Sequence, residues 1–285
     1  MATNEFRASG DLAAPLRAPR TGAWARNREL LGELVRRDVQ ARYRGSVLGI
    51  LWSLFNPLVF MVVYTVVFSH FANLHFQGKS YPAYIIAGLL AWNFFSQGLS
   101  SATSSIVSNA GLVRKVSFSW VLLTVSSVLA ALVNYLISLV LLIPFFIIFH
   151  LVPGWPLLLL PVLVLVTFAL VLGLGLVLAA GNVFFRDLEY LVTVVTLVWF
   201  YLTPIIYQLS LVYQHDHGTL GRTFGLLVKL NPMTWIVTAQ QDVIEANQWP
   251  QHWHGLLYAV AMAAVAVAVG VGVFGRVRRR FAEEV

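Results

Sequence analysis

Few residues of this chain have the types and spacing that catalysis or metal binding requires. The 285-residue sequence has no cysteine, which excludes disulfides, zinc–thiolate sites and thiol nucleophiles. The sequence has no Gly-x-x-x-x-Gly-Lys-Ser or Gly-x-x-x-x-Gly-Lys-Thr motif, so it has no phosphate cradle of the P-loop kind. The acidic residues are too scattered for the metal-dependent chemistry of a membrane glycosyl or phosphoglycosyl transferase, which makes that class the weakest candidate. We therefore expect no enzyme activity and no cofactor in this chain.

The strongest candidate for a metal site is a group of histidines in polar segments. His215, Asp216 and His217 are consecutive, and His252 and His254 follow later in the same region. Zinc needs three or four such ligands around one point, whereas His-x-His pairs in polar loops are usually just solvated. We therefore predict no metal site.

Many of the charged residues gather instead in one amphipathic segment, residues 24–45. Its apolar residues recur at intervals of three and four, namely Leu30, Leu31, Leu34, Val35, Val39 and Tyr43. Arginines occupy many of the remaining positions. This pattern predicts a helix that lies in the plane of the membrane interface, on the cytoplasmic side, with its arginines against anionic headgroups.

The composition places most of the chain in a lipid bilayer. Hydrophobic residues make up 59% of the sequence, charged residues 11%, and the mean hydropathy is +0.77, whereas a soluble domain carries roughly a quarter charged residues. Six apolar runs are candidates to cross a hydrocarbon layer of roughly 30 Å. We therefore predict an all-α integral membrane protein whose six transmembrane helices are residues 47–70, 81–107, 120–150, 157–180, 191–209 and 255–275.

These patterns divide the chain into four regions: a disordered cytoplasmic leader (1–23), the interface helix (24–45), the six-span domain (46–275) and a basic cytoplasmic tail (276–285). Gly173 and Gly175 in the fourth span favour a close helix–helix contact. Two short apolar segments within residues 210–253 flank Asn231-Pro232. They predict re-entrant helices that dip into the outer leaflet, with an ordinary outer loop as the alternative.

The basic residues predict the orientation of the six spans. Lys79, Arg222 and Lys229 are the only lysines and arginines on one side, and all the others fall on the opposite side. Because basic residues concentrate in cytoplasmic loops, both termini are predicted to be cytoplasmic. No Asp, Glu, Lys or Arg falls within the predicted spans, so a coupling ion has no obvious binding site.

Four segments carry a resemblance to a known family: ARYRGSVLGILWSLFNPLVFMVVYTVVFS, NAGLVRKVSF, FRDLEYL and LNPMTWIV. The chain, over about residues 24–280, resembles the membrane subunit of bacterial polysaccharide ABC exporters, most closely the Wzm type that exports O-antigen. The resemblance implies a homodimer in the bacterial inner membrane, with two copies of a separate ATPase subunit that binds ATP and Mg. It also implies a lipid-linked polysaccharide substrate, specifically undecaprenyl-linked, and a channel along the dimer interface.

The resemblance assigns two sites near the cytoplasmic side. The connector 108–119 corresponds to the helix that docks into the ATPase, although the cytoplasmic excess of basic residues alone would also place its two cations there. Arg42, Tyr43 and Arg44 fall where the lipid-linked sugar enters, and guanidinium groups match pyrophosphate oxygens well. The expected docking residues are Asn109, Leu112, Val113, Arg114, Lys115 and Phe118.

The resemblance also assigns the first and fifth spans to the channel wall, where aromatic rings contact sugars. Aromatic faces stack on sugar C–H surfaces without selecting one sugar sequence. The same rings equally suit an interfacial belt or lipid packing. The candidates are Trp52, Phe55, Tyr64, Trp199, Phe200, Tyr201 and Tyr207.

Two rivals to O-antigen export remain open. A teichoic-acid exporter of the same family shares the LNPMTWIV turn. A lipid scramblase or passive channel would need no ATPase and would be indifferent to loss of residues 110–118. In each case the expected partners include membrane lipids and no nucleic acid.

Overall fold

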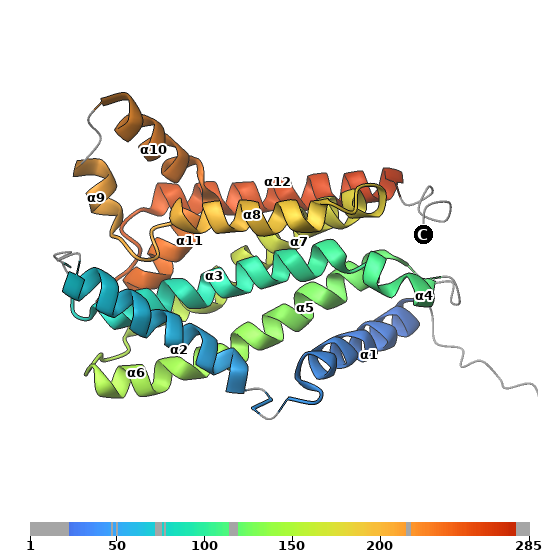
Figure 1. The fold of residues 1–285 in the computed structure, drawn as a ribbon, viewed down its shortest axis with the longest axis horizontal. Helices are drawn as coiled ribbons and strands as arrows, with labels where there is room; N and C mark the ends of the chain where they lie inside the picture. The colour runs from blue at the N-terminus through green and yellow to red at the C-terminus, as the bar shows by residue number, and fades with distance from the viewer. Residues whose placement is uncertain are drawn as a thin grey trace, which may run out of the picture.

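The computed structural model describes residues 23–46, 48–49, 51–71, 76, 78–113, 119–214 and 218–277. All regular secondary structure in these residues is helical, as predicted (Figure 1). The α-helices are α1 (Ala23–Tyr43), α2 (Leu51–Thr65), α3 (Tyr81–Ser104), α4 (Ala110–Val113), α5 (Val121–Ser138), α6 (Leu142–Ile148), α7 (Leu160–Phe184), α8 (Leu188–Tyr201), α9 (Leu209–Gln214), α10 (Gly218–Leu230), α11 (Pro232–Gln241) and α12 (Trp253–Val277). Short 3₁₀ and π segments join some of them, including η2 (Val107–Asn109), η3 (Leu139–Leu141) and η5 (Asp242–Ala246).

Helix α3 runs through the centre of the bundle and contacts α2, α5, α7, α8 and α11. The Ser80 hydroxyl caps its first turn by accepting a hydrogen bond from the Ala83 amide, at 3.4 Å. Further along, a Cβ on Gly98 would lie only 2.7 Å from Val171 Cγ1, so the glycine allows α7 to approach closely. Most α3 side chains are buried, and α3 is therefore the scaffold against which the other helices are placed.

Helices α7 and α12 make the most intimate contact in the bundle. A Cβ on Gly173 would lie 2.3 Å from the Ala266 carbonyl carbon, and one on Gly270 would lie 2.5 Å from the Gly173 carbonyl oxygen. Glycine has no side chain, so the two backbones can approach this closely. In lipid, van der Waals packing rather than the hydrophobic effect holds helices together, and a close approach strengthens that packing. The close helix–helix contact predicted at Gly173 is confirmed.

Four helical segments of the described chain are long and apolar enough to cross a membrane: Leu51–Ser69, Val121–Ile148, Trp155–Phe184 and Trp253–Val277. Helix α3 has 24 residues, but amide and hydroxyl side chains lower its hydropathy. Helix α8 has only 14 residues, and the chain leaves the helix after Tyr201, shortly before Pro204, because the residue preceding a proline disfavours helical backbone. Spans at α3 and α8 therefore stay predictions.

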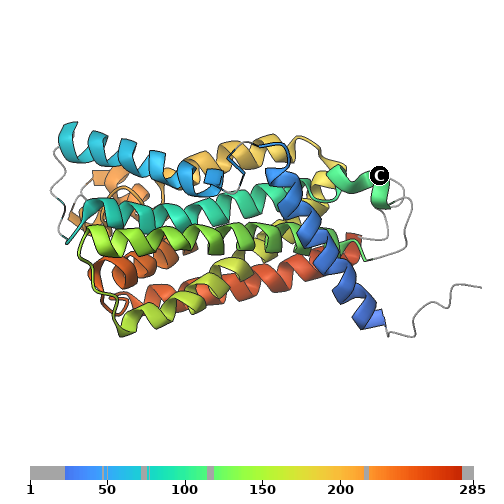
Figure 2. The ribbon, with the colours of Figure 1, turned by 90° about the horizontal axis from the view of Figure 1, so that it is seen from below.

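The bundle has two distinct ends. Helix α4, the start of α1 and the end of α12 lie at one end, while α9 and α10 lie at the other (Figure 1). Helix α1 crosses obliquely beside α5 instead of running along the bundle (Figure 2). Gly45, with φ of 77°, follows its last turn in the left-handed conformation that glycine readily adopts. This arrangement matches a helix lying on the membrane interface, a placement that stays a prediction.

Two short helices flank the Asn231-Pro232 turn, as predicted. Helix α10 is largely exposed, whereas α11 is almost wholly buried against α3, α7 and α12. The Asn231 side chain caps α11 by accepting from the Met233 amide at 2.9 Å, and it also accepts from Trp199 Nε1 at 2.7 Å. The turn is thus fastened to α8. Insertion of α10 and α11 into the outer leaflet stays a prediction.

Candidate functional site

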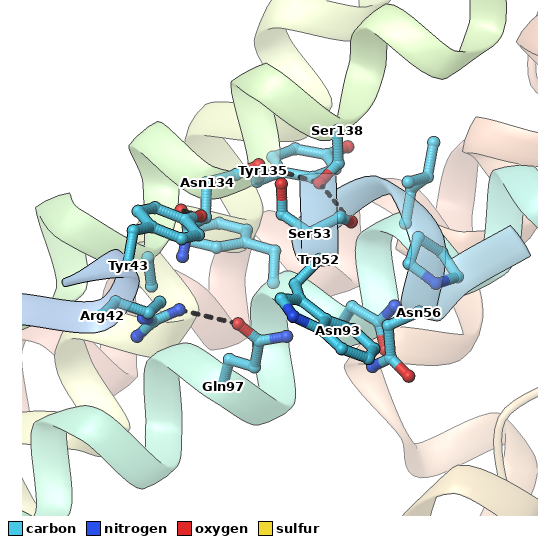
Figure 3. A pocket seen from close by; sticks show the side chains of 14 residues that line it. Arg42, Tyr43, Trp52, Ser53, Asn56, Asn93, Gln97, Asn134, Tyr135 and Ser138 are labelled. Atoms are coloured by element: carbon cyan, nitrogen blue, oxygen red, sulfur yellow. Dashed lines mark hydrogen bonds between the residues drawn. The ribbon is translucent and has the colours of Figure 1, made fainter. Parts of the chain in front are cut away.

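A polar cavity of about 280 Å³ opens where the end of α1 meets α2, α3 and α5 (Figure 3). Its polar and aromatic lining comes from all four helices. Helix α1 contributes Arg42 and Tyr43, α2 contributes Trp52, Ser53 and Asn56, α3 contributes Asn93, Phe94 and Gln97, and α5 contributes Asn134, Tyr135 and Ser138. We call this cavity the amide pocket, because four of these residues carry carboxamide groups.

Arg42 is held at one end of the amide pocket by helix α3. Its Nη1 donates to Gln97 Oε1 at 2.8 Å, and its Nη2 donates to Ser101 Oγ at 3.2 Å. Desolvation lowers the pKa of the Arg42 guanidinium from its ordinary value, although part of the side chain is exposed. An accessible cation attracts an anionic ligand, and guanidinium groups bind phosphate oxygens particularly well.

Helix α1 is fastened to α5 on the side of Tyr43 and Asp38. The Tyr43 hydroxyl donates to Asn134 Oδ1, and Ser126 Oγ donates to Asp38 Oδ2 at 3.3 Å. Asp38 is also paired with Arg37 at 2.8 Å. These bonds, together with those of Arg42, set the position of the last turn of α1 relative to the bundle.

The structure brings together two of the three residues predicted to receive the lipid-linked sugar. Arg42 and Tyr43 line the amide pocket, whereas Arg44 lines a neighbouring depression with Arg37 and Gln40. The separation follows from helical geometry, since residues two apart point to different sides of a helix.

Five of the seven predicted channel rings fall into two groups. Trp52 and Phe55 lie edge to face at 5.6 Å near the start of α2. Tyr64, farther along α2, stacks on Phe200 of α8 at 5.8 Å, and Phe200 contacts Tyr201 at 5.4 Å.

The two remaining rings are engaged elsewhere. Trp199 lies against Phe95 at 5.0 Å and hydrogen-bonds Asn231, while Tyr207 lies near Phe224 at 6.4 Å. Trp199 therefore serves as a fastening between helices α3, α8 and the Asn231-Pro232 turn. A sugar-contacting role for these rings stays a prediction.

Much of the predicted docking segment lies outside the described residues, including Arg114, Lys115 and Phe118. Asn109 ends η2, where its Nδ2 donates to the Ser105 carbonyl at 2.8 Å, and Leu112 and Val113 end α4. Of the candidate metal ligands, His215, Asp216 and His217 also lie outside, and His252 is 5.8 Å from the Trp235 ring. In the described part of the chain, no three potential metal ligands gather at one point.

Charged residues within the predicted spans do not point to the amides of the pocket, because those spans contain no Asp, Glu, Lys or Arg. Asn56, Asn93 and Asn134 each stand alone in a mainly apolar run, and Gln97 lies one turn beyond Asn93. Polar side chains at membrane depth are costly and usually mark function. Isolated amides in apolar helices are therefore the sequence feature that could have predicted this pocket.

Comparison with known proteins identifies the family. Residues 29–244 match the model of the ABC-2 type transporter family. The O-antigen export system permease protein RfbA of Myxococcus xanthus is 33% identical over 258 residues, covering 90% of this chain and 96% of that protein. The protein of the same name from Klebsiella pneumoniae is 25% identical over 259 residues, covering 90% and 94%. The chain therefore belongs to the ABC-2 type transporter family of membrane proteins.

Proposed function

We propose that the chain is the membrane subunit of an ATP-driven exporter that moves an undecaprenyl-linked, O-antigen-type polysaccharide across the bacterial inner membrane. The observation that carries this proposal is the end-to-end similarity to the Myxococcus xanthus O-antigen export permease, at 33% identity over 90% of this chain. A chain of the same family and nearly the same extent is expected to share the substrate class. The similarity favours O-antigen over teichoic acid.

ATP hydrolysis comes from a separate subunit in this proposal, because the sequence has no P-loop. The segment 108–119 is the expected docking site for that subunit. Its described part, η2 and α4, lies at the same end of the bundle as the start of α1 and the end of α12 (Figure 1). Because these segments gather at one end of the bundle, they could form a single docking surface for the ATPase at its cytoplasmic end.

The substrate reaches this subunit as a lipid-linked sugar diphosphate, and Arg42 is the group that receives its charge. The Arg42 cation lines the amide pocket and is exposed. Arg44, on the neighbouring face, adds positive charge to the approach without lining the pocket.

A homodimer supplies the channel, and α2 and α8 form its wall. The two helices lie on one face of the bundle (Figure 2), and the Tyr64–Phe200 stack joins them. Their outward side chains are apolar or aromatic and largely exposed, among them Phe55, Val59, Val194, Val198 and Tyr201. A second copy of the chain would cover this face.

The absence of native cysteine makes the dimer directly testable. Val194→Cys on α8 should be linked to the same residue of the second copy by a bifunctional thiol cross-linker in native membranes, whereas Val269→Cys on α12, comparably exposed and equally apolar, should not. Equal cross-linking of both variants, or of neither, would contradict the α2–α8 interface.

The proposed function itself is tested by co-expressing and co-purifying the chain with a candidate ATPase subunit from the same organism. Wild type should form a stable complex whose ATP hydrolysis responds to lipid-linked polymer. The double substitution Arg114→Glu with Lys115→Glu should break or uncouple that complex. A chain that purifies alone and ignores the substitution would favour the ATP-independent scramblase or channel.

A further inference from the structure

The amide pocket extends well beyond the guanidinium that would bind a phosphate. Arg42 and Gln97 lie toward one end of it, and Asn56 and Asn93 lie toward the opposite end (Figure 3). Apart from Arg42, none of its lining residues is ionisable to a charged form at neutral pH. The pocket therefore offers one cationic end and a neutral, polar remainder.

The four amides retain hydrogen-bonding capacity that the described residues do not use. The side-chain oxygens of Gln97 and Asn134 accept from Arg42 and Tyr43, which leaves both amide nitrogens as donors into the pocket. The side chains of Asn56 and Asn93 make no hydrogen bond to any described residue. Gln97 and Asn134 thus help to hold α1, whereas Asn56 and Asn93 have no such structural task in the described chain.

A carboxamide carries both a donor and an acceptor, as a hydroxyl group does, and can therefore bind two adjacent hydroxyls. Trp52 lines the same pocket and is half-exposed, so its ring offers an apolar surface for the C–H groups of a sugar. By contrast, Phe94 and Tyr135 stack on one another at 5.1 Å, which occupies one face of each. A pocket that combines amides for the hydroxyl groups with one accessible indole for the C–H groups suits a polyhydroxylated ring such as a sugar.

The size of the pocket also suits such a ring. A cavity of about 150 Å³ in a protein core is known to hold benzene. The amide pocket, at about 280 Å³, has room for a six-membered ring together with its hydroxyl groups.

From these observations we infer that the amide pocket binds the first sugar of the lipid-linked substrate, a neutral hexose or N-acetylhexosamine, while Arg42 binds the adjoining diphosphate. Asn56 and Asn93 then recognise the sugar hydroxyls and Trp52 contacts its apolar face. This inference rests on the proposed function. It adds a specificity site that reads the sugar nearest the lipid, whatever the rest of the polymer contains.

The test uses the purified complex of this chain with its ATPase in lipid nanodiscs. The probes are polyprenyl diphosphates that carry one neutral hexose or N-acetylhexosamine, compared with the same polyprenyl diphosphate without sugar. Wild type should bind at least one sugar-bearing lipid about tenfold more tightly than the bare diphosphate, which corresponds to one or two net hydrogen bonds. Asn93→Leu should reduce that ratio to within about twofold, with the affinity for the bare diphosphate unchanged.

Two further variants serve as a second test of the pocket and as a negative control. Asn56→Ala changes an exposed α2 position that should fold normally, and it should also reduce the ratio even if Asn93→Leu does not fold. Gln214→Leu, an exposed amide on α9, should leave the ratio unchanged.

The outcomes separate this inference from the proposed function. If wild type binds the bare and sugar-bearing lipids equally, the sugar site is wrong while diphosphate capture stands. If the pocket variants keep the wild-type ratio, the sugar is recognised elsewhere. Failure of wild type to bind either lipid would overturn the proposed function together with this inference.

Discussion

Two contacts in this bundle follow opposite rules. Where α7 meets α12, glycine brings one backbone within van der Waals range of the other. Where α1, α2, α3 and α5 meet, amides and hydroxyls surround a cavity of about 280 Å³. The first contact contributes stability through close packing. In the second, the side chains of Asn56 and Asn93 make no hydrogen bond to a described residue and are accessible to a ligand.

The largest expected effect comes from breaking the close contact. Gly173→Leu would force a side chain into the Ala266 backbone, which cannot move aside as a flexible side chain can. We expect loss of folded protein, seen as aggregation in size-exclusion chromatography or a melting temperature lower by more than about 10 °C.

The matched control is Gly272→Leu on α12, where an added Cβ meets no atom within 4 Å. This variant should behave like wild type. If both substitutions were tolerated equally, the α7–α12 contact would not be the stabilising one.

An intermediate effect is expected from Tyr43→Phe, which removes one hydrogen bond between α1 and α5. The bond to Asn134 is lost and its amide oxygen is left without that donor, so the free energy of unfolding should fall by about 1 kcal/mol. That corresponds to a melting temperature lower by roughly 2–4 °C for a chain of this size. A melting temperature lower by more than about 10 °C would show that the α1–α5 contact at Tyr43 is as essential to the fold as the α7–α12 contact.

The smallest effect on stability is expected from Asn93→Leu, which should separate stability from polysaccharide export. Leucine replaces an amide that has no described hydrogen-bond partner, so the melting temperature should stay within about 2 °C of wild type or rise slightly. Export of polysaccharide should fall at the same time. If Asn93→Leu were strongly destabilised but each folded molecule still exported polysaccharide normally, the Asn93 amide would serve stability rather than substrate binding.

The sequence predicted the helical architecture well because composition and apolar run length act locally. The amphipathic helix expected at 24–45 is α1, and the two helices around Asn231-Pro232 are α10 and α11. The contact at Gly173 was also predictable, since small residues in an apolar run favour close helix approach.

Which helices pair was not predictable from these patterns. Helix α7 is apolar on all sides, so its sequence does not indicate that α3 and α12 are its main neighbours. For the same reason, the division of the predicted channel rings into separate groups emerges only from the structure. The amide pocket depends on residues from four helices, and no single segment of sequence contains more than part of it.

The central claim is that Arg42, held at the amide pocket, receives the anionic end of a lipid-linked polysaccharide. The most direct measurement is surface polysaccharide in cells whose only copy of this chain carries Arg42→Gln, compared with Arg36→Gln, an exposed arginine on the same helix. The account predicts at least about a tenfold loss of export for Arg42→Gln, with the ATPase still co-purifying, and near-normal export for Arg36→Gln. Normal export with Arg42→Gln would contradict it.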